Sequence, residues 1–270
     1  MKGLFTTICF LWLSTLSRAQ GDSVFRLLRT IPVTAVDMAV DNLNNLYLLT
    51  PSDQLKKYNA QGDSVSVYNQ TKRFGKLFSI DASNPLKLLL YYKDFSTIVI
   101  LDRLLSIRST IDLRQQNITQ ASAIGLSYDN NIWVFDALEN KLKKVDEFGV
   151  TLSESIDFRT VFPQAFVPQR IIDYNGSVYL YDPAQGVAIF DYYGTLQKKL
   201  PIRGWQNLSV LDKQIIGTDN RHIYTYYTNN LMERQYQFPS SFGSFSRYLI
   251  ANTQLFALSK DSVNIYSLRF

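Results

Sequence analysis

The stretch VDMAVDNLNNLYLLTPSDQLKKYNAQGDSV occupies residues 36–65 and alternates short apolar runs with polar turns. A first run ends at Asp41, and a second lies within 40–49. A third run leads to Tyr58, and a fourth follows Gly62. Runs rich in Val, Leu and Tyr and bounded by Asn, Asp and Gly are typical of β-strands. Glycine suits a tight turn because it adopts positive φ without steric cost. The stretch therefore predicts four antiparallel strands.

This four-strand pattern returns along the whole chain. From Tyr58, the ends of the third runs recur at positions 101, 145, 190, 226 and 266, in steps of 43, 44, 45, 36 and 40 residues. The first runs end at an Asp or Asn in every unit: Asp41, Asp81, Asp129, Asp173, Asp212 and Asn252. Six four-stranded units of this length predict an all-β fold, a six-bladed β-propeller.

The two ends of the chain predict how the ring closes. The sixth unit supplies strands at 248–251, 254–259 and 263–270, and then the chain stops one strand short. A spare strand, SVFRLLRTI at 23–31, precedes the first unit. We expect this strand to complete the last blade by pairing with 263–270, which would also remove an unpaired sheet edge.

Residues 1–20 read as a secretory signal peptide, followed by a single propeller domain over 21–270. Lys2 precedes a largely apolar run at 4–16, and SRAQ offers small residues for cleavage. An uncleaved anchor or a buried strand is the alternative. The only cysteine, Cys9, belongs to this leader, so an exported chain would depend on its core rather than on disulfides. We expect an exported protein of the periplasm or cell surface, associated with the outer membrane, with no transmembrane segment in the mature chain.

Charge gives little indication of a nucleic-acid partner. The chain has 28 basic and 23 acidic residues and a net charge of +5, of which Lys2 and Arg18 belong to the leader. The sequence contains no run of five like charges, so it has no basic tail or stripe for nucleic acid.

The repeat resembles that of NHL-type six-bladed propellers. In that repeat an Asp turn leads to Asn-apolar-Tyr-apolar, then to a polar loop and a strand that ends in Asp/Asn-x-x-Gly. Residues 36–65, 125–150 and 174–194 match this order most closely. The resemblance implies the fold and says little about activity, because this fold includes enzymes, RNA-binding domains and protein-docking modules. The SRAQ ending resembles those of exported Bacteroidota proteins and implies a Bacteroidota-like source.

The sequence contains few candidate residues for catalysis. Lyases with a similar fold hold zinc with several histidines, whereas this chain has only His222. Lactonase-like propellers hold calcium with carboxylates, for which Asp41, Asp81, Asp129, Asp173 and Asp212 are candidates. The alternative is that each Asp bonds to the backbone of its own turn. We therefore assign no catalytic residue, metal ligand or cofactor, and lean towards a protein that is not an enzyme.

Loops between blades carry the residues that best suit a partner. Four of them, at 72–78, 159–170, 203–207 and 239–247, combine Phe, Trp and Arg, which are enriched at binding hot spots. The candidate partner-binding residues are Arg73, Phe74, Phe162, Phe166, Arg170, Arg203, Trp205, Phe242 and Arg247. The same face is predicted to carry an acidic set: Asp53, Asp94, Asp136, Glu139, Asp182, Asp219 and Asp261. The alternative is that the aromatic residues only pack between blades.

These patterns favour a cell-envelope propeller that binds a protein or peptide partner as a scaffold. An accessory subunit of an outer-membrane complex would fit this description. The other function considered is a calcium-dependent hydrolase or lyase of the lactonase-like type.

Overall fold

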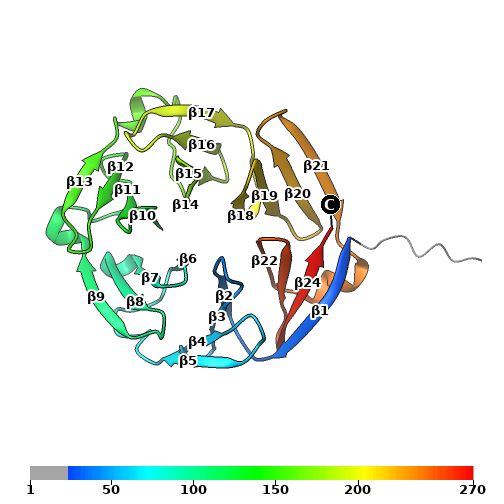
Figure 1. Cartoon of the computed structure of the whole chain (residues 1–270). Helices are drawn as coiled ribbons and strands as arrows, with labels where there is room; N and C mark the ends of the chain where they lie inside the picture. The colour runs from blue at the N-terminus through cyan, green and yellow to red at the C-terminus, as the bar shows by residue number, and fades with distance from the viewer. Residues whose placement is uncertain (1–23, 270) are drawn as a thin grey trace, which may run out of the picture.

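The computed structural model describes residues 24–269, which form a ring of six four-stranded antiparallel sheets (Figure 1). The predicted six-bladed propeller is therefore confirmed. The leader at 1–20 lies outside the described residues, so its cleavage stays a prediction. Helical structure within 24–269 is limited to four short 3₁₀ helices: η1 (Lys93–Phe95), η2 (Leu113–Gln116), η3 (Phe158–Thr160) and η4 (Ser240–Ser244). In this described part, no helix is long and apolar enough to cross a membrane.

Blades 1 to 3 follow one another in chain order, and each runs from the ring axis outwards. Blade 1 contains β2 (Asp37–Val40), β3 (Leu46–Leu49), β4 (Leu55–Tyr58) and β5 (Ser64–Tyr68). Blade 2 contains β6 (Ser79–Asn84), β7 (Lys87–Tyr92), β8 (Thr97–Asp102) and β9 (Ile107–Asp112). Blade 3 contains β10 (Ala121–Leu126), β11 (Ile132–Asp136), β12 (Lys141–Val145) and β13 (Thr151–Glu154).

Blades 4 and 5 repeat the arrangement, and blade 6 joins the two ends of the chain. Blade 4 contains β14 (Arg170–Tyr174), β15 (Ser177–Asp182), β16 (Gly186–Phe190) and β17 (Leu196–Leu200). Blade 5 contains β18 (Gln206–Leu211), β19 (Gln214–Thr218), β20 (His222–Tyr227) and β21 (Met232–Gln237). Blade 6 contains β22 (Arg247–Ala251), β23 (Gln254–Leu258), β24 (Ser262–Leu268) and, from the other end of the chain, β1 (Phe25–Pro32).

The predicted closure of the ring is confirmed. Strand β1 pairs antiparallel with β24, from Phe25 opposite Leu268 to Pro32 opposite Ser262, and the two lie side by side in Figure 1. A bulge between Leu27 and Arg29 interrupts the register once. Position 23 and position 270 of the predicted pairing lie outside the described residues.

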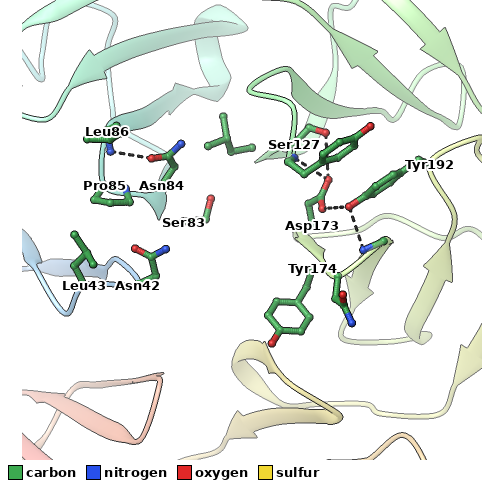
Figure 2. Close-up of a pocket in the computed structure, with 14 residues that line it drawn as sticks. Asn42, Leu43, Ser83, Asn84, Pro85, Leu86, Ser127, Asp173, Tyr174 and Tyr192 are labelled. Atoms are coloured by element: carbon green, nitrogen blue, oxygen red, sulfur yellow. Dashed lines mark hydrogen bonds between the residues drawn. The ribbon is translucent and has the colours of Figure 1, made fainter.

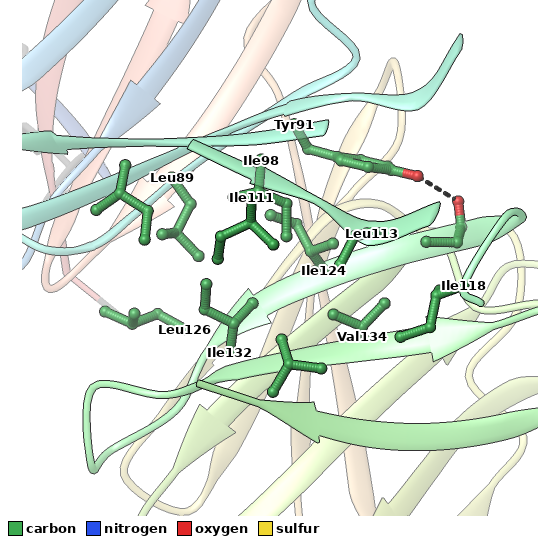
Figure 3. Close-up of a cluster of buried hydrophobic side chains, with 13 residues drawn as sticks. Leu89, Tyr91, Ile98, Ile111, Leu113, Ile118, Ile124, Leu126, Ile132 and Val134 are labelled. Carbon is green, nitrogen blue, oxygen red and sulfur yellow. Dashed lines mark hydrogen bonds between the residues drawn. The ribbon is translucent and has the colours of Figure 1, made fainter. Parts of the chain in front are cut away.

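The core of the molecule lies between the blades. Six clusters of buried apolar side chains occur, one for each pair of neighbouring blades. In the cluster between blades 2 and 3, Leu89 and Ile98 pack towards Ile124 and Ile132 (Figure 3). Each blade thus needs both neighbours to bury its two faces, which makes closure of the ring a condition for a complete core.

Burial changes across each blade for the same reason. All six residues of β7, a second strand, are buried because blades pack against both of its faces. All four residues of the outermost strand β13 are exposed. The sequence of a strand buried on both faces is a continuous apolar run rather than an alternating pattern, and after Lys87 the rest of β7, LLLYY, is such a run.

The regular spacing seen in the sequence comes from one turn between third and fourth strands. In blade 2, Asp102 Oδ1 accepts hydrogen bonds from the backbone N–H groups of Leu104 and Ser106, both at 2.8 Å. Asn59, Asp146 and Asp191 cap the equivalent turns in the same way. The last-but-one turn position has positive φ and is glycine in three blades; in blade 2 it is Leu105, at φ 66°. Short polar side chains that hold the local backbone explain why this turn recurs.

Candidate functional site

The propeller presents two different faces. Because successive strands are antiparallel, the turns from first to second and from third to fourth strands lie on one face, here called the turn face. The loops from second to third strands and the crossovers between blades lie on the other, here called the loop face. The sequence analysis placed the binding residues on the loop face.

Four of the predicted aromatic residues are buried on the loop-face side. Phe162 and Phe166 belong to the cluster between blades 3 and 4, where their rings stack at 4.5 Å. Trp205 belongs to the cluster between blades 4 and 5, and Phe242 to the cluster between blades 5 and 6. Phe74 is half-buried and packs beside Tyr92. The packing alternative therefore holds for the four buried rings, while their role in binding stays a prediction.

The predicted arginines separate into two groups. Arg73 and Arg203 are exposed on loops, and Arg73 lies over the ring of Phe74 at 5.3 Å. Arg170 and Arg247 begin the innermost strands β14 and β22 and therefore lie by the ring axis. Nothing in the structure tests whether these nine residues bind a partner.

Arg203 and Trp205 also line a small hollow between blades 4 and 5, here called the side hollow. Its volume is about 300 Å³, and its lining includes the carboxylates Asp219 and Glu233. Burial alone would raise the pKa of Asp219, but hydrogen bonds, the largest from Tyr224, outweigh burial and lower it. Burial and the bond to Asp219 raise the pKa of the Tyr224 hydroxyl to about 12. The side hollow is therefore a polar site in which the Asp219 carboxylate is charged at neutral pH.

The predicted acidic set is largely occupied by internal partners. Lys143 Nζ lies 2.9 Å from both Asp136 and Glu139, and Asp136 is buried. Burial would lower the pKa of Lys143, but these two partners outweigh burial and raise it. Asp182 accepts hydrogen bonds from the backbone N–H groups of Val167 and Ala184, both at 2.8 Å. Asp182 thus holds loops of its own chain, and Asp136 and Glu139 share the charge of Lys143.

A hollow larger than the side hollow lies on the opposite face, at the ring axis. This axial hollow has a volume of about 760 Å³ and is formed by the turns between first and second strands of blades 1 to 4 (Figure 2). Its lining consists mainly of carboxamides, hydroxyls and phenols with a few apolar side chains. The residues that line it are Asn42, Leu43, Ser83, Asn84, Pro85, Leu86, Leu126, Ser127, Tyr128, Asp173, Tyr174, Asn175, Gly176 and Tyr192.

Asp173 fixes one wall of the axial hollow by joining two blades. Its Oδ2 accepts a hydrogen bond from Trp133 Nε1 of blade 3 at 2.9 Å, and longer ones from Ser127 Oγ and Tyr128 N. Its Oδ1 accepts one from the Tyr192 hydroxyl at 2.7 Å (Figure 2). Burial and the Asp173 carboxylate raise the pKa of Tyr192 well above its ordinary value, so this phenol stays a hydrogen-bond donor.

An aromatic stack stands beside this wall. The rings of Tyr128 and Tyr192 stack at 4.3 Å with an interplanar angle of 11°. Lys144 Nζ lies over both of them and over Trp133, at 4.9 to 5.7 Å, and pairs with Asp129. Cation–π contacts and the ion pair together hold Tyr128 in place, although 64% of this side chain is exposed.

Exposed apolar side chains stand at the tips of turns on this same face. Tyr193 is 91% exposed and Phe148 76% exposed, each at the third position of an Asp-capped turn. Other exposed members on blades 1 to 3 are Leu43, Leu86, Leu104 and Tyr128. Apolar side chains gathered on one face of a protein commonly mark a contact surface.

The five aspartates considered as calcium ligands do not gather at one point. Asp41, Asp81 and Asp129 each accept hydrogen bonds from N–H groups of their own turns. Asp173 instead bonds across to blade 3. Among residues 24–269, no group of three or more histidines and carboxylates could hold a metal ion. His222 bonds to Asp219 beside the side hollow.

Comparisons with known proteins support the fold. No family model matches the chain, and no curated protein matches its sequence. Virginiamycin B lyase from Staphylococcus aureus aligns with a TM-score of 0.62 at 10% identity, covering 91% of this chain and 100% of the lyase. The WD40 domain of Neurospora crassa Pan2 aligns at 0.59 and 11%, covering 91% and 96%. BBS1N, solved in complex with ARL6DN, aligns at 0.56 and 12%, covering 92% and 98%. At these identities the likeness shows a shared propeller fold and no shared activity.

The sequence analysis missed the turn face. A signal was visible, because an apolar residue stands in the middle of the turns at Leu43, Leu104, Phe148 and Tyr193 and is exposed in each. The binding residues were predicted instead in the aromatic crossovers between blades, and most of the rings there are buried.

Proposed function

We propose that this chain is an exported, non-enzymatic propeller of the NHL type that binds a partner protein in the cell envelope through its turn face. The signal-like residues 1–20 and the repeat pattern support export and the NHL type. The SRAQ ending supports a Bacteroidota-like source and an outer-membrane location.

The observation that carries the proposal is the set of exposed apolar side chains on the turn face, the face that also carries the axial hollow. Tyr193, Phe148 and Tyr128 are large apolar side chains whose burial by a partner would be favourable. The capped turns fix the backbone at Phe148 and Tyr193, and the aromatic stack holds the ring of Tyr128. Rigid aromatic groups lose little entropy on binding, so they are effective anchors.

The occupant we propose is a folded protein rather than a single extended peptide. The exposed side chains extend over blades 1 to 4 on more than one side of the hollow. A broad surface with a projecting side chain would cover them and enter the hollow together, whereas one extended strand would cover a narrow track. Propeller neighbours such as BBS1N, which was solved with a protein partner, agree with a docking role for this fold.

The loop-face residues remain a second proposed contact region. Arg73 and Arg203 are the members with exposed side chains outside the ring axis.

The test is capture of a stoichiometric partner from envelope extract by tagged chain, compared among matched variants. Phe148→Ser and Tyr193→Ser should each weaken capture about tenfold or more, since each loses an anchor of about 1.5–3 kcal/mol. Leu138→Ser is the matched control, because Leu138 is 57% exposed on the loop face of the same blade as Phe148. Equal retention by all three variants, or loss only with Leu138→Ser, would overturn the turn-face proposal.

A further inference from the structure

The loop-face end of the ring axis carries a group of hydrogen-bond donors from three consecutive blades. The innermost strands begin there, and their register against the second strands makes six positions equivalent: Asp37, Ser79, Ala121, Arg170, Gln206 and Arg247. Blades 4, 5 and 6 thus contribute Arg, Gln and Arg in succession. These strands surround the axis in Figure 1.

Arg170 has a guanidinium that no carboxylate pairs with among residues 24–269. Its side chain is exposed to solvent, yet burial within the ring lowers its pKa, with the charge of Asp81 opposing this effect and that of Arg247 adding to it. Both observations hold for a side chain at the axis, where it meets water but is surrounded by protein. Asp81 lies in reach of that charge, but its oxygens already accept bonds from Leu126 N and Ser83 N.

Arg247 also has an unused donor. One terminal nitrogen pairs with Asp37 of blade 1, while its Nε is buried and has no hydrogen-bond partner among the described residues. Buried donors in proteins are nearly always satisfied, by protein, water or a ligand. Burial raises the pKa of Asp37, against the opposing effect of Arg247, so the pair is held in a place where charge is costly.

We propose that Arg170 and Arg247, assisted by Gln206, form a binding site for a small oxyanion at the loop-face end of the axis. A carboxylate or a phosphate group is the chemistry that fits, because the planar guanidinium donates two parallel hydrogen bonds to either group. The anion would neutralise the unpaired charge of Arg170, and the nearby charge of Arg247 would add to the attraction. This site is on the face opposite the partner-docking surface and does not depend on it.

The experiment measures binding of inorganic phosphate and, separately, of succinate to the purified mature chain by titration calorimetry at low ionic strength. At least one of the two should bind saturably, with a dissociation constant on the order of 1 mM or lower. Binding of one and not the other identifies the class of oxyanion. Arg170→Gln and Arg247→Gln should each weaken that binding about tenfold or more.

The control is Arg221→Gln, which removes the same charge from an exposed loop-face residue outside the axis. It should leave binding within about twofold of the parent. Arg170→Lys, which keeps the charge but loses the planar fork, should bind more weakly than the parent and serves if Arg170→Gln does not fold. The proposal is overturned if neither anion binds the parent chain, or if Arg221→Gln weakens binding as much as Arg170→Gln. Phe148→Ser should leave anion binding unchanged, so failure here and failure of the docking proposal are separable.

Discussion

Asp173 and Asp41 were both predicted to end a first strand, but they make different contacts. Asp41 bonds to the N–H groups of Leu43 and Asn45 in its own turn, as the sequence pattern predicts. Asp173 bonds to Trp133 of the neighbouring blade and to Tyr192 of its own. Asp41 follows the last pair of β2, whereas Asp173 pairs with Val178 inside β14. A difference of one residue in register places the two side chains on different sides of the strand and gives them different partners.

Replacing Asp173 with alanine should destabilise the fold by about 2–4 kcal/mol. The indole N–H of Trp133 and the hydroxyl of Tyr192 would both lose their acceptor in a mostly buried place. Asp63→Ala is the matched control, since Asp63 is exposed and accepts from the Asn59 side chain only; it should cost less than about 1 kcal/mol. Urea unfolding of both variants gives the comparison, and equal losses would contradict the assigned role.

Asp219 gives a prediction for the dependence of stability on pH. Its folded-state pKa is lowered because hydrogen bonds from Tyr224 and nearby N–H groups outweigh burial. The stabilisation is thus fully present above the unfolded value of about 4 and is lost as pH falls through the lower folded value. Asp219→Asn should therefore be less stable than the parent at pH 6, and the difference should shrink at pH 2.5. A constant difference between the two pH values in urea unfolding would contradict this account.

Strand β1 shows how one element completes the ring. Its pairing with β24 was predictable, because the last unit lacked a strand and the first had one to spare. Its burial is uneven: Ile31 packs into the cluster between blades 6 and 1, whereas Leu28 is about half exposed. The strand thus contributes Ile31 to the cluster between blades 6 and 1, and the partly buried Phe25, beside Phe238 and Phe242, to the cluster between blades 5 and 6.

Ile31→Ala should lower the free energy of unfolding by about 2–4 kcal/mol, because it leaves a cavity between the blades that the closure joins. Leu28→Ala removes a similar side chain from the same strand and should cost less than about 0.5 kcal/mol. Thermal unfolding followed by circular dichroism tests the pair. Comparable losses would show that burial does not decide the contribution of β1.

At the scale of the whole molecule, much of the fold was predictable and most of the site was not. The number of blades followed from turns such as those capped by Asp102, Asp146 and Asp191, which use only local bonds. The burial of Phe162 and Trp205 could not be predicted, because it depends on how each crossover folds back between two blades.

The exposed surface of the turn face could not be predicted for the same reason. Exposed residues such as Phe148 and Tyr193 share one face only because every blade directs its turn between third and fourth strands to the same side of the ring. The axial hollow likewise exists only in the closed ring, since four blades supply its lining. A single repeat carries no information about either feature.

The most direct test of the central claim is photo-cross-linking within cells that export the chain. A photoreactive phenylalanine analogue would replace Tyr193 on the turn face in one variant and Leu138 on the loop face in another. The account predicts one discrete cross-linked protein product from position 193 and none from position 138. A product from position 138 alone, or no product from either position, would contradict it.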